Sequence, residues 1–324
     1  MRGKWSWNCK KNVKKSSLSS PQWLKFPLRR DDFLKGKGNG GERVTKREEI
    51  FSKLEKVPSF PSSAGRVLDL IQKPDVDFQE VVKLIEYDPL LTTNILRLAN
   101  SAYYRGLAKI ETVRDAVLRL GLDNIFNMVV AIGFAPIAQK TVDPYDLTAG
   151  SFFEHSVAVA IGSVHLAKML RLKVPPYLFT AALLHDIGKV VLGTYAGVDG
   201  EEIRRVCQKE GVQFEVAERK VLGTDHAEVG AALLRLWNMP ENIVSVVEFH
   251  HGGVPLENGL APHMVHLANS FCLMSGVGGE REGVDNLPSY EILSHYRMGD
   301  MVSAKLVESI EGELESALSL FRGV

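Results

Sequence analysis

The sequence has few cysteines, and none of them are paired at the spacing that a zinc site or a redox disulfide uses. Cys9, Cys207 and Cys272 are the three cysteines of the 324-residue chain, and they lie far apart. A disulfide framework and a cysteine zinc site are therefore not expected, and unpaired thiols are typical of a reducing compartment. We predict a cytoplasmic location.

Long apolar runs and signal features are also missing. No uninterrupted apolar run approaches the roughly 18 residues of a membrane span, so no membrane partner is expected. The basic N-terminus is not followed by the apolar stretch of about 7–15 residues that marks a secretory signal. The sequence contains no glycine-rich phosphate loop and no nucleophile elbow. These exclusions leave scattered ionisable side chains as the candidates for chemistry.

Charge is balanced over the whole chain but unevenly placed. The 39 basic and 39 acidic side chains give a net charge of zero, yet residues 1–47 hold 14 Lys and Arg against 3 Asp and Glu. Three interpretations of this segment stay open: a disordered basic tail, a translation start at Val44, or an arm that binds nucleic acid. The second rests on Gly40-Gly41-Glu42, whose codons can resemble a bacterial ribosome-binding site. Nucleic acid is not the partner that we expect.

Beyond the basic segment, apolar residues recur at helical spacing, without an alternating strand pattern or a fixed repeat. Asp77, Thr112 and Asp225 stand where helix N-caps are expected, and Gly121 stands where a helix would stop. A single apolar helix is predicted over residues 175–193. The sequence therefore predicts an all-α fold.

The helical pattern divides the rest of the chain into three parts. Residues 48–145 form the first helical part, and residues 146–275 form the second. Residues 276–324 are predicted to be a polar loop followed by a last amphipathic helix, at about 300–321.

A group of histidines and one aspartate is the strongest candidate for a functional site. These side chains are spread over several predicted helices: His155, His185, Asp186, His226, His250 and His251. Imidazole and carboxylate are ligands for iron, manganese, zinc or nickel, and helix bundles build such sites from facing helices. Only tertiary folding can bring these residues together. The alternative is that each histidine is separately solvated or hydrogen-bonded in the core.

The order His, His-Asp, His, His-His resembles the HD superfamily of metal-dependent phosphohydrolases, most specifically in "LLHDIGK" at residues 183–189. Three further segments resemble the HDOD domain, a bacterial signal-output module. They are "LIEYDPLLTTNILRLANSAYY", "TVRDAVLRLGLDNI" and "VLGTDHAEVGAALLRLWNMP". The resemblance covers roughly residues 50–275. It implies a multi-helix fold in which an N-terminal helical subdomain packs on an HD-like helical bundle.

The resemblance also implies a ligand set for a divalent metal. In HD enzymes the first histidine, the His-Asp pair and a late aspartate hold one metal, and further histidines hold a second metal with the same aspartate as a bridge. His155, His185 and Asp186 match the first set, whereas His226, His250 and His251 match the second. The late aspartate is replaced by Asn269. His266, three residues earlier, either substitutes for it or has a surface or supporting role.

Two differences from the HD enzymes, and one residue shared with them, bear on activity. The pair His250-His251 is followed by "GGVPLENG", without the Gly-Tyr-Pro segment of the HD-GYP phosphodiesterases, so hydrolysis of cyclic-di-GMP is disfavoured. The amide of Asn269 is neutral and a weaker ligand than a carboxylate. Lys189 is retained, and it is either a catalytic cation near a substrate phosphate or an exposed helix lysine.

Two functions follow from the resemblance. The favoured one is a stand-alone regulatory signalling protein with a protein partner on its N-terminal half and an HD-type site that is not an active phosphodiesterase. The alternative is a metal-dependent phosphohydrolase that acts on a nucleotide or phosphodiester, using metal-activated water. The amide of Asn269, in place of a carboxylate ligand, favours the regulatory function. An intermediate case, in which a metal, nucleotide or phosphate binds without turnover, is also open.

Overall fold

In the computed structural model the described residues fall within residues 42–324. The described residues are 44–58, 62–101, 104, 109–139, 142, 145, 147–252, 255–256, 259–277 and 288–319. The predictions on the basic segment before Val44 lie outside the described residues, as does most of the loop predicted after residue 276.

The predicted all-α fold is confirmed, because the described residues form helices and no strand beyond an isolated bridge between Val142 and Leu147. The helices are α2 (Lys46–Ser52), α3 (Ser62–Ile71), α4 (Phe78–Glu86), α5 (Pro89–Ala99), α6 (Val113–Ala138), α7 (Ser151–Met169), α8 (Leu178–Leu184), α9 (Ile187–Val190), α10 (Gly200–Glu210), α11 (Phe214–Leu222), α12 (His226–Leu236), α13 (Glu241–Phe249), α14 (Leu260–Ser275), α15 (Tyr290–His295) and α16 (Asp300–Ser319). A 3-10 turn, η2 (Leu54–Lys56), follows α2, and a π-helical turn, η4 (Val191–Tyr195), follows α9.

The predicted helix ends are also confirmed. The side chains of Asp77, Thr112 and Asp225 each accept a hydrogen bond from a backbone N–H in the first turn of the helix that follows. Gly121 has φ 78° and ψ 164° and interrupts α6. These caps satisfy N–H groups that a helix start otherwise leaves unpaired.

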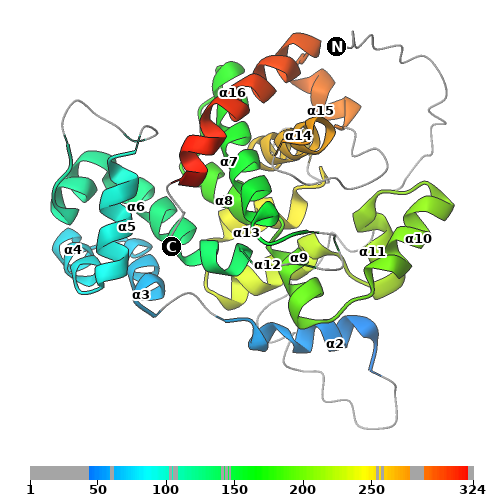
Figure 1. The fold of residues 1–324 in the computed structure, drawn as a ribbon, viewed down its shortest axis with the longest axis horizontal. Coiled ribbons are helices and arrows are strands. Elements are labelled where there is room, and N and C mark those ends of the chain that lie inside the picture. The colour runs from blue at the N-terminus through cyan, green and yellow to red at the C-terminus, as the bar shows by residue number, and fades with distance from the viewer. Residues whose placement is uncertain are drawn as a thin grey trace. The chain divides into compact units, whose positions relative to one another are not determined.

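Two groups of helices share α6 (Figure 1). Helices α3, α4 and α5 pack against one another and against α6, whereas α7, α8, α12, α13 and α14 form a second group, with α16 packed on α7. Helix α6 also contacts α7, α8 and α9. Its residues from 125 onward are almost all buried, because they face apolar neighbours from both groups.

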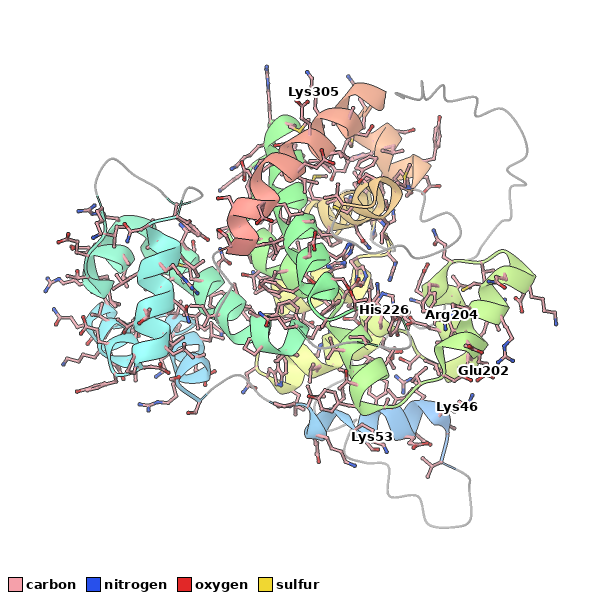
Figure 2. The ribbon with its side chains drawn as sticks, viewed as in Figure 1. Lys46, Lys53, Glu202, Arg204, His226 and Lys305 are labelled. Atoms are coloured by element: carbon pink, nitrogen blue, oxygen red, sulfur yellow. The ribbon has the colours of Figure 1, made fainter. Side chains whose placement is uncertain are left out.

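Helix α2 packs on the second group of helices, although it precedes the first group in the chain. Arg47 pairs with Glu228 of α12, and Lys46 lies 3.3 Å from Glu202 of α10. Figure 2 shows Lys46 and Glu202 at facing edges of α2 and α10. The turn η2 also contacts η4, so this segment lies beside the helices that carry the histidines.

One described helix, α6, is long and apolar enough to cross a membrane by its length and composition. Asn124 and Asn127 interrupt its apolar residues, so it is not the uninterrupted apolar run that the sequence lacks. Of its most apolar stretch, 67% is buried inside the protein. Because a buried core helix has the same composition, this property is weak evidence for a membrane segment.

The continuous helix predicted over residues 175–193 is wrong. The chain leaves helical geometry at Asp186, with φ −102° and ψ 11°, and α9 follows as a separate short helix. Here the backbone of α9 passes close to α12, since a Cβ on Gly188 would stand 1.9 Å from the carbonyl oxygen of His226. The break therefore places His185 and Asp186 where two helices meet.

We expect Gly188→Ala to lower the free energy of unfolding by at least about 1–3 kcal/mol, because the added methyl group meets backbone that cannot rotate away. Urea unfolding followed by circular dichroism measures this change. Gly65→Ala is the matched control, because a Cβ there meets nothing within 4 Å inside helix α3. It should gain about 0.5–1 kcal/mol. Equal stability of the two variants would contradict the close approach.

Candidate metal centre

The structure brings together all six histidine and aspartate side chains that the sequence singled out. His155 comes from α7, His185 and Asp186 from the junction of α8 and α9, and His226 from the first position of α12. His250 and His251 follow the end of α13. All are buried except His251, which is partly exposed. Figure 2 labels His226, a buried side chain, among the helices.

Asp186 stands between two groups of ligand atoms. Its Oδ2 lies 3.1 Å from Nε2 of His185 and 3.9 Å from Nε2 of His155. Its Oδ1 lies 3.2 Å from Nε2 of His226 and 3.3 Å from Nε2 of His250. One group is thus His155, His185 and Asp186; the other is His226, His250 and His251, and the ligand atoms within each lie within 4.8 Å of one another.

Backbone carbonyls fix the orientation of two of these rings. Nδ1 of His185 donates to the carbonyl of Ala182 at 2.8 Å, and Nδ1 of His250 donates to that of Val247 at 2.6 Å. In the neutral form of a ring bonded in this way the lone pair is on Nε2, and both Nε2 atoms face Asp186. Both Nε2 atoms are buried and have no hydrogen-bond partner among the described residues. Lone pairs that face a buried carboxylate repel it unless a cation lies between them, so these residues fit a metal ion.

Glu218 orients the third ring. Its Oε2 accepts hydrogen bonds from Nδ1 of His226 at 2.6 Å and from the backbone N–H of His226 at 3.0 Å. Its Oε1 accepts one from the hydroxyl of Tyr145 at 2.5 Å. Burial opposes protonation of His226, but the charge of Glu218 and the contact with Asp186 raise its pKa well above the ordinary value. A metal ion bound at Nε2 therefore displaces a proton.

The shifted pKa values of three further groups favour the forms that bind metals. Burial lowers the pKa of His155 to about 3 and that of His250 to about 4, so both rings are neutral at pH 7. Burial would raise the pKa of Asp186, but the nearby His185 and Lys189 hold it well below its usual range. A neutral imidazole and an ionised carboxylate both bind divalent metals.

Lys189 is completely buried, so its interpretation as an exposed helix lysine is wrong. Its Nζ lies 2.7 Å from Oδ2 of Asp186, on the side of that carboxylate where His155 and His185 lie. The amino group also stands 5.8 Å from the ring centroid of Tyr145. Both contacts stabilise the charge of a buried ammonium group.

Asn269 lies beside the cluster, on α14, where its Oδ1 is 3.0 Å from Nε2 of His155. Because an amide oxygen only accepts hydrogen bonds, Nε2 of His155 carries the proton. Neither ring nitrogen of His266 faces Asp186: its Nδ1 donates to the backbone carbonyl of His250 at 3.2 Å, and its Nε2 accepts from the backbone N–H of Ser289. The idea that His266 replaces the late aspartate is therefore wrong, and it supports the chain next to His250 instead.

Sequence analysis missed Glu218 and Tyr145. A signal for Glu218 is present, because it falls on the apolar stripe of α11, four residues after Phe214 and four before Leu222. A charged residue on such a stripe is buried and needs a partner. Tyr145 lies in the connection between α6 and α7, where no periodic pattern points to it.

We expect Glu218→Gln to weaken metal binding about 10- to 100-fold, because the ring of His226 then loses the anion that orients it. Competition with a chromogenic chelator measures the affinity. Glu201→Gln on α10 removes the same charge from an exposed side chain and should leave the affinity unchanged. An unchanged affinity in Glu218→Gln would show that this carboxylate does not support a metal site.

Among solved structures, an HDOD domain protein with unknown function from Geobacter sulfurreducens shares the fold. It is 26% identical, with a TM-score of 0.65 over 86% of this chain and 97% of that chain. A proposed phosphohydrolase from Shewanella amazonensis SB2B is 24% identical, with a TM-score of 0.62 over 85% of this chain and 97% of that one. At that identity the second likeness concerns the fold alone.

Sequence comparisons agree with the structural ones. An uncharacterized protein of Treponema pallidum (strain Nichols) is 27% identical over 207 residues, which are 62% of this chain and 39% of that protein. The chain thus spans less than half the length of this curated relative. A family model for the HDOD domain matches residues 57–252, more than half of the chain and the segments that carry all six clustered ligands. The protein therefore belongs to the HDOD domain family.

Proposed function

We propose that this protein is a regulatory signalling module whose HD-type centre binds a metal ion without hydrolysing phosphodiesters. The observation that carries the proposal is the ion pair between Lys189 and Asp186, beside an amide at position 269. A phosphohydrolase needs a metal that activates water and an open position for the phosphoryl group. In this chain a lysine and an amide occupy one side of the shared carboxylate.

The burial of the ligands supports the same proposal. His155, His185, Asp186 and His250 are fully buried, and the side chain of His251 is 25% exposed. A metal ion in such surroundings exchanges slowly and ties α9, α12 and α13 together. Its role would then be to stabilise the fold of a signalling surface.

We further propose a protein partner on the first group of helices, in the cytoplasm. Tyr87, Leu90 and Leu118 are large apolar side chains on α4, α5 and α6 or at their ends, and they are 84%, 55% and 61% exposed. Large exposed apolar side chains on one group of helices are typical of interaction surfaces.

Phosphohydrolysis of a nucleotide or phosphodiester is the second candidate. The two oxygens of Asp186 face two separate groups of histidines, and a carboxylate in that position can bridge two metal ions. In this alternative Lys189 would leave Asp186 to offset the charge of a substrate phosphate. His226 and His250 would hold the second ion.

An assay of phosphodiester hydrolysis distinguishes the regulatory function from the phosphohydrolase function. Protein loaded in turn with manganese, iron, zinc or nickel is incubated with bis(p-nitrophenyl) phosphate and with a panel of nucleotides. We expect release of nitrophenol and of phosphate to stay at the level of a His250→Gln control, because Lys189 and Asn269 occupy one side of the shared carboxylate. Metal-dependent turnover in the wild type that His250→Gln abolishes would overturn the regulatory proposal.

The partner is tested with a photo-crosslinking amino acid placed at Leu118 in cells that make the protein. We expect a discrete crosslinked species that Tyr87→Ala weakens, since both side chains belong to the proposed surface. Tyr290, an 81% exposed side chain on α15, is the matched crosslinking position outside it. The same species from Tyr290, or none from Leu118, would contradict the surface.

A further inference from the structure

The two sides of Asp186 are not chemically equivalent. Its Oδ2 faces a lysine and two histidines, whereas its Oδ1 faces histidines alone. Both sides contain candidate metal ligands, so the number of metal ions that the centre holds depends on whether each side can accept one.

The side of Oδ2 already holds a cation, although Nε2 of His185 on this side has no hydrogen-bond partner among the described residues. The ammonium of Lys189 stands 2.7 Å from Oδ2 and supplies the positive charge that a metal would otherwise bring. Nε2 of His155 uses its proton to bond Asn269, so that nitrogen offers no lone pair. Two like charges on one carboxylate oxygen repel, and this repulsion is strong away from water. Nε2 of His185 and Oδ2 are then the two ligand atoms left on this side, fewer than the three or more protein ligands of a typical transition-metal site.

The side of Oδ1 offers imidazole nitrogens as metal ligands. Nε2 of His226 and Nε2 of His251 lie 2.8 Å apart, so a proton on one of them is hydrogen-bonded to the lone pair of the other, and a metal ion can replace that proton. Nε2 of His250 is buried without a hydrogen-bond partner among the described residues and lies 3.3 Å from Oδ1. Three imidazole nitrogens and one carboxylate oxygen form a ligand set that suits a first-row transition metal.

We propose that the centre holds one metal ion, bound by His226, His250, His251 and Oδ1 of Asp186, while Lys189 and Asn269 take the place of a second ion. The inference rests on the proposed function, because it concerns the same centre. It adds that the lysine is a built-in cation, and that His155 is a hydrogen-bonding residue and not a ligand.

The metal count of purified protein tests this assignment. Apo protein is saturated with manganese, freed of excess by gel filtration, and analysed by elemental mass spectrometry and electron paramagnetic resonance. We expect one ion per chain with the spectrum of an isolated ion. Two ions per chain, or the exchange-coupled spectrum of a bridged pair, would overturn the proposal, as would the absence of binding.

Two matched variants locate the ion. His250→Gln should lose it, whereas His155→Gln should keep it, because glutamine can still donate a hydrogen bond to Asn269. Circular dichroism shows whether each variant is folded. Loss of the ion from folded His155→Gln, with retention in His250→Gln, would place the metal on the other side of Asp186 and contradict the assignment.

A third variant tests the role of the lysine. Lys189→Met combined with Asn269→Asp removes the internal cation and restores a carboxylate, so we expect a second manganese ion and a coupled spectrum. Lys305→Met combined with Asn269→Asp is the control, since Lys305 is an exposed lysine of α16, and it should still bind one ion. A single ion in both folded double variants would show that Lys189 does not exclude the second. These measurements count metal ions and do not measure hydrolysis. A negative result here would therefore contradict the assignment of the metal without deciding whether the protein hydrolyses phosphodiesters.

Discussion

The structure depends on a carboxylate that is buried away from water. An ionised aspartate in an apolar interior costs several kcal/mol unless positive charge and hydrogen bonds surround it. Asp186 obtains that charge from Lys189 on one oxygen and from the proton on His226, or a metal ion in its place, on the other. The positions of α7, α9, α12 and α13 around it follow from this requirement, because each supplies or adjoins a group that faces the carboxylate.

The backbone is adapted to the same requirement. Gly188 and Gly230 let α9 and α12 approach so closely that a side chain at either position would meet the other helix. Without that approach, His226 at the start of α12 would not reach Asp186. The helix break before α9 serves the same end, since an unbroken helix would carry the His-Asp pair along one straight axis. Small residues and a local loss of helix regularity thus allow the polar contacts.

Much of the fold and the membership of the cluster could be predicted from the sequence. Caps such as Thr112 and Asp225 leave local signals, and the His-Asp pair is specific enough to suggest its distant partners. The sequence could not reveal which atoms face which. The burial of Lys189, the bond between Asn269 and His155, and the support from Glu218 all depend on tertiary packing. The periodic pattern of apolar residues does not predict which oxygen of a carboxylate faces a cation.

The hydrogen bond from Tyr145 to Glu218 has a consequence for signal transfer. Tyr145 belongs to the segment that joins α6 to α7, and Glu218 holds the ring of His226. Occupancy of the centre and the placement of this segment are therefore thermodynamically linked. Linkage is reciprocal: an event that displaces the segment changes metal affinity by the same factor by which the metal resists the displacement.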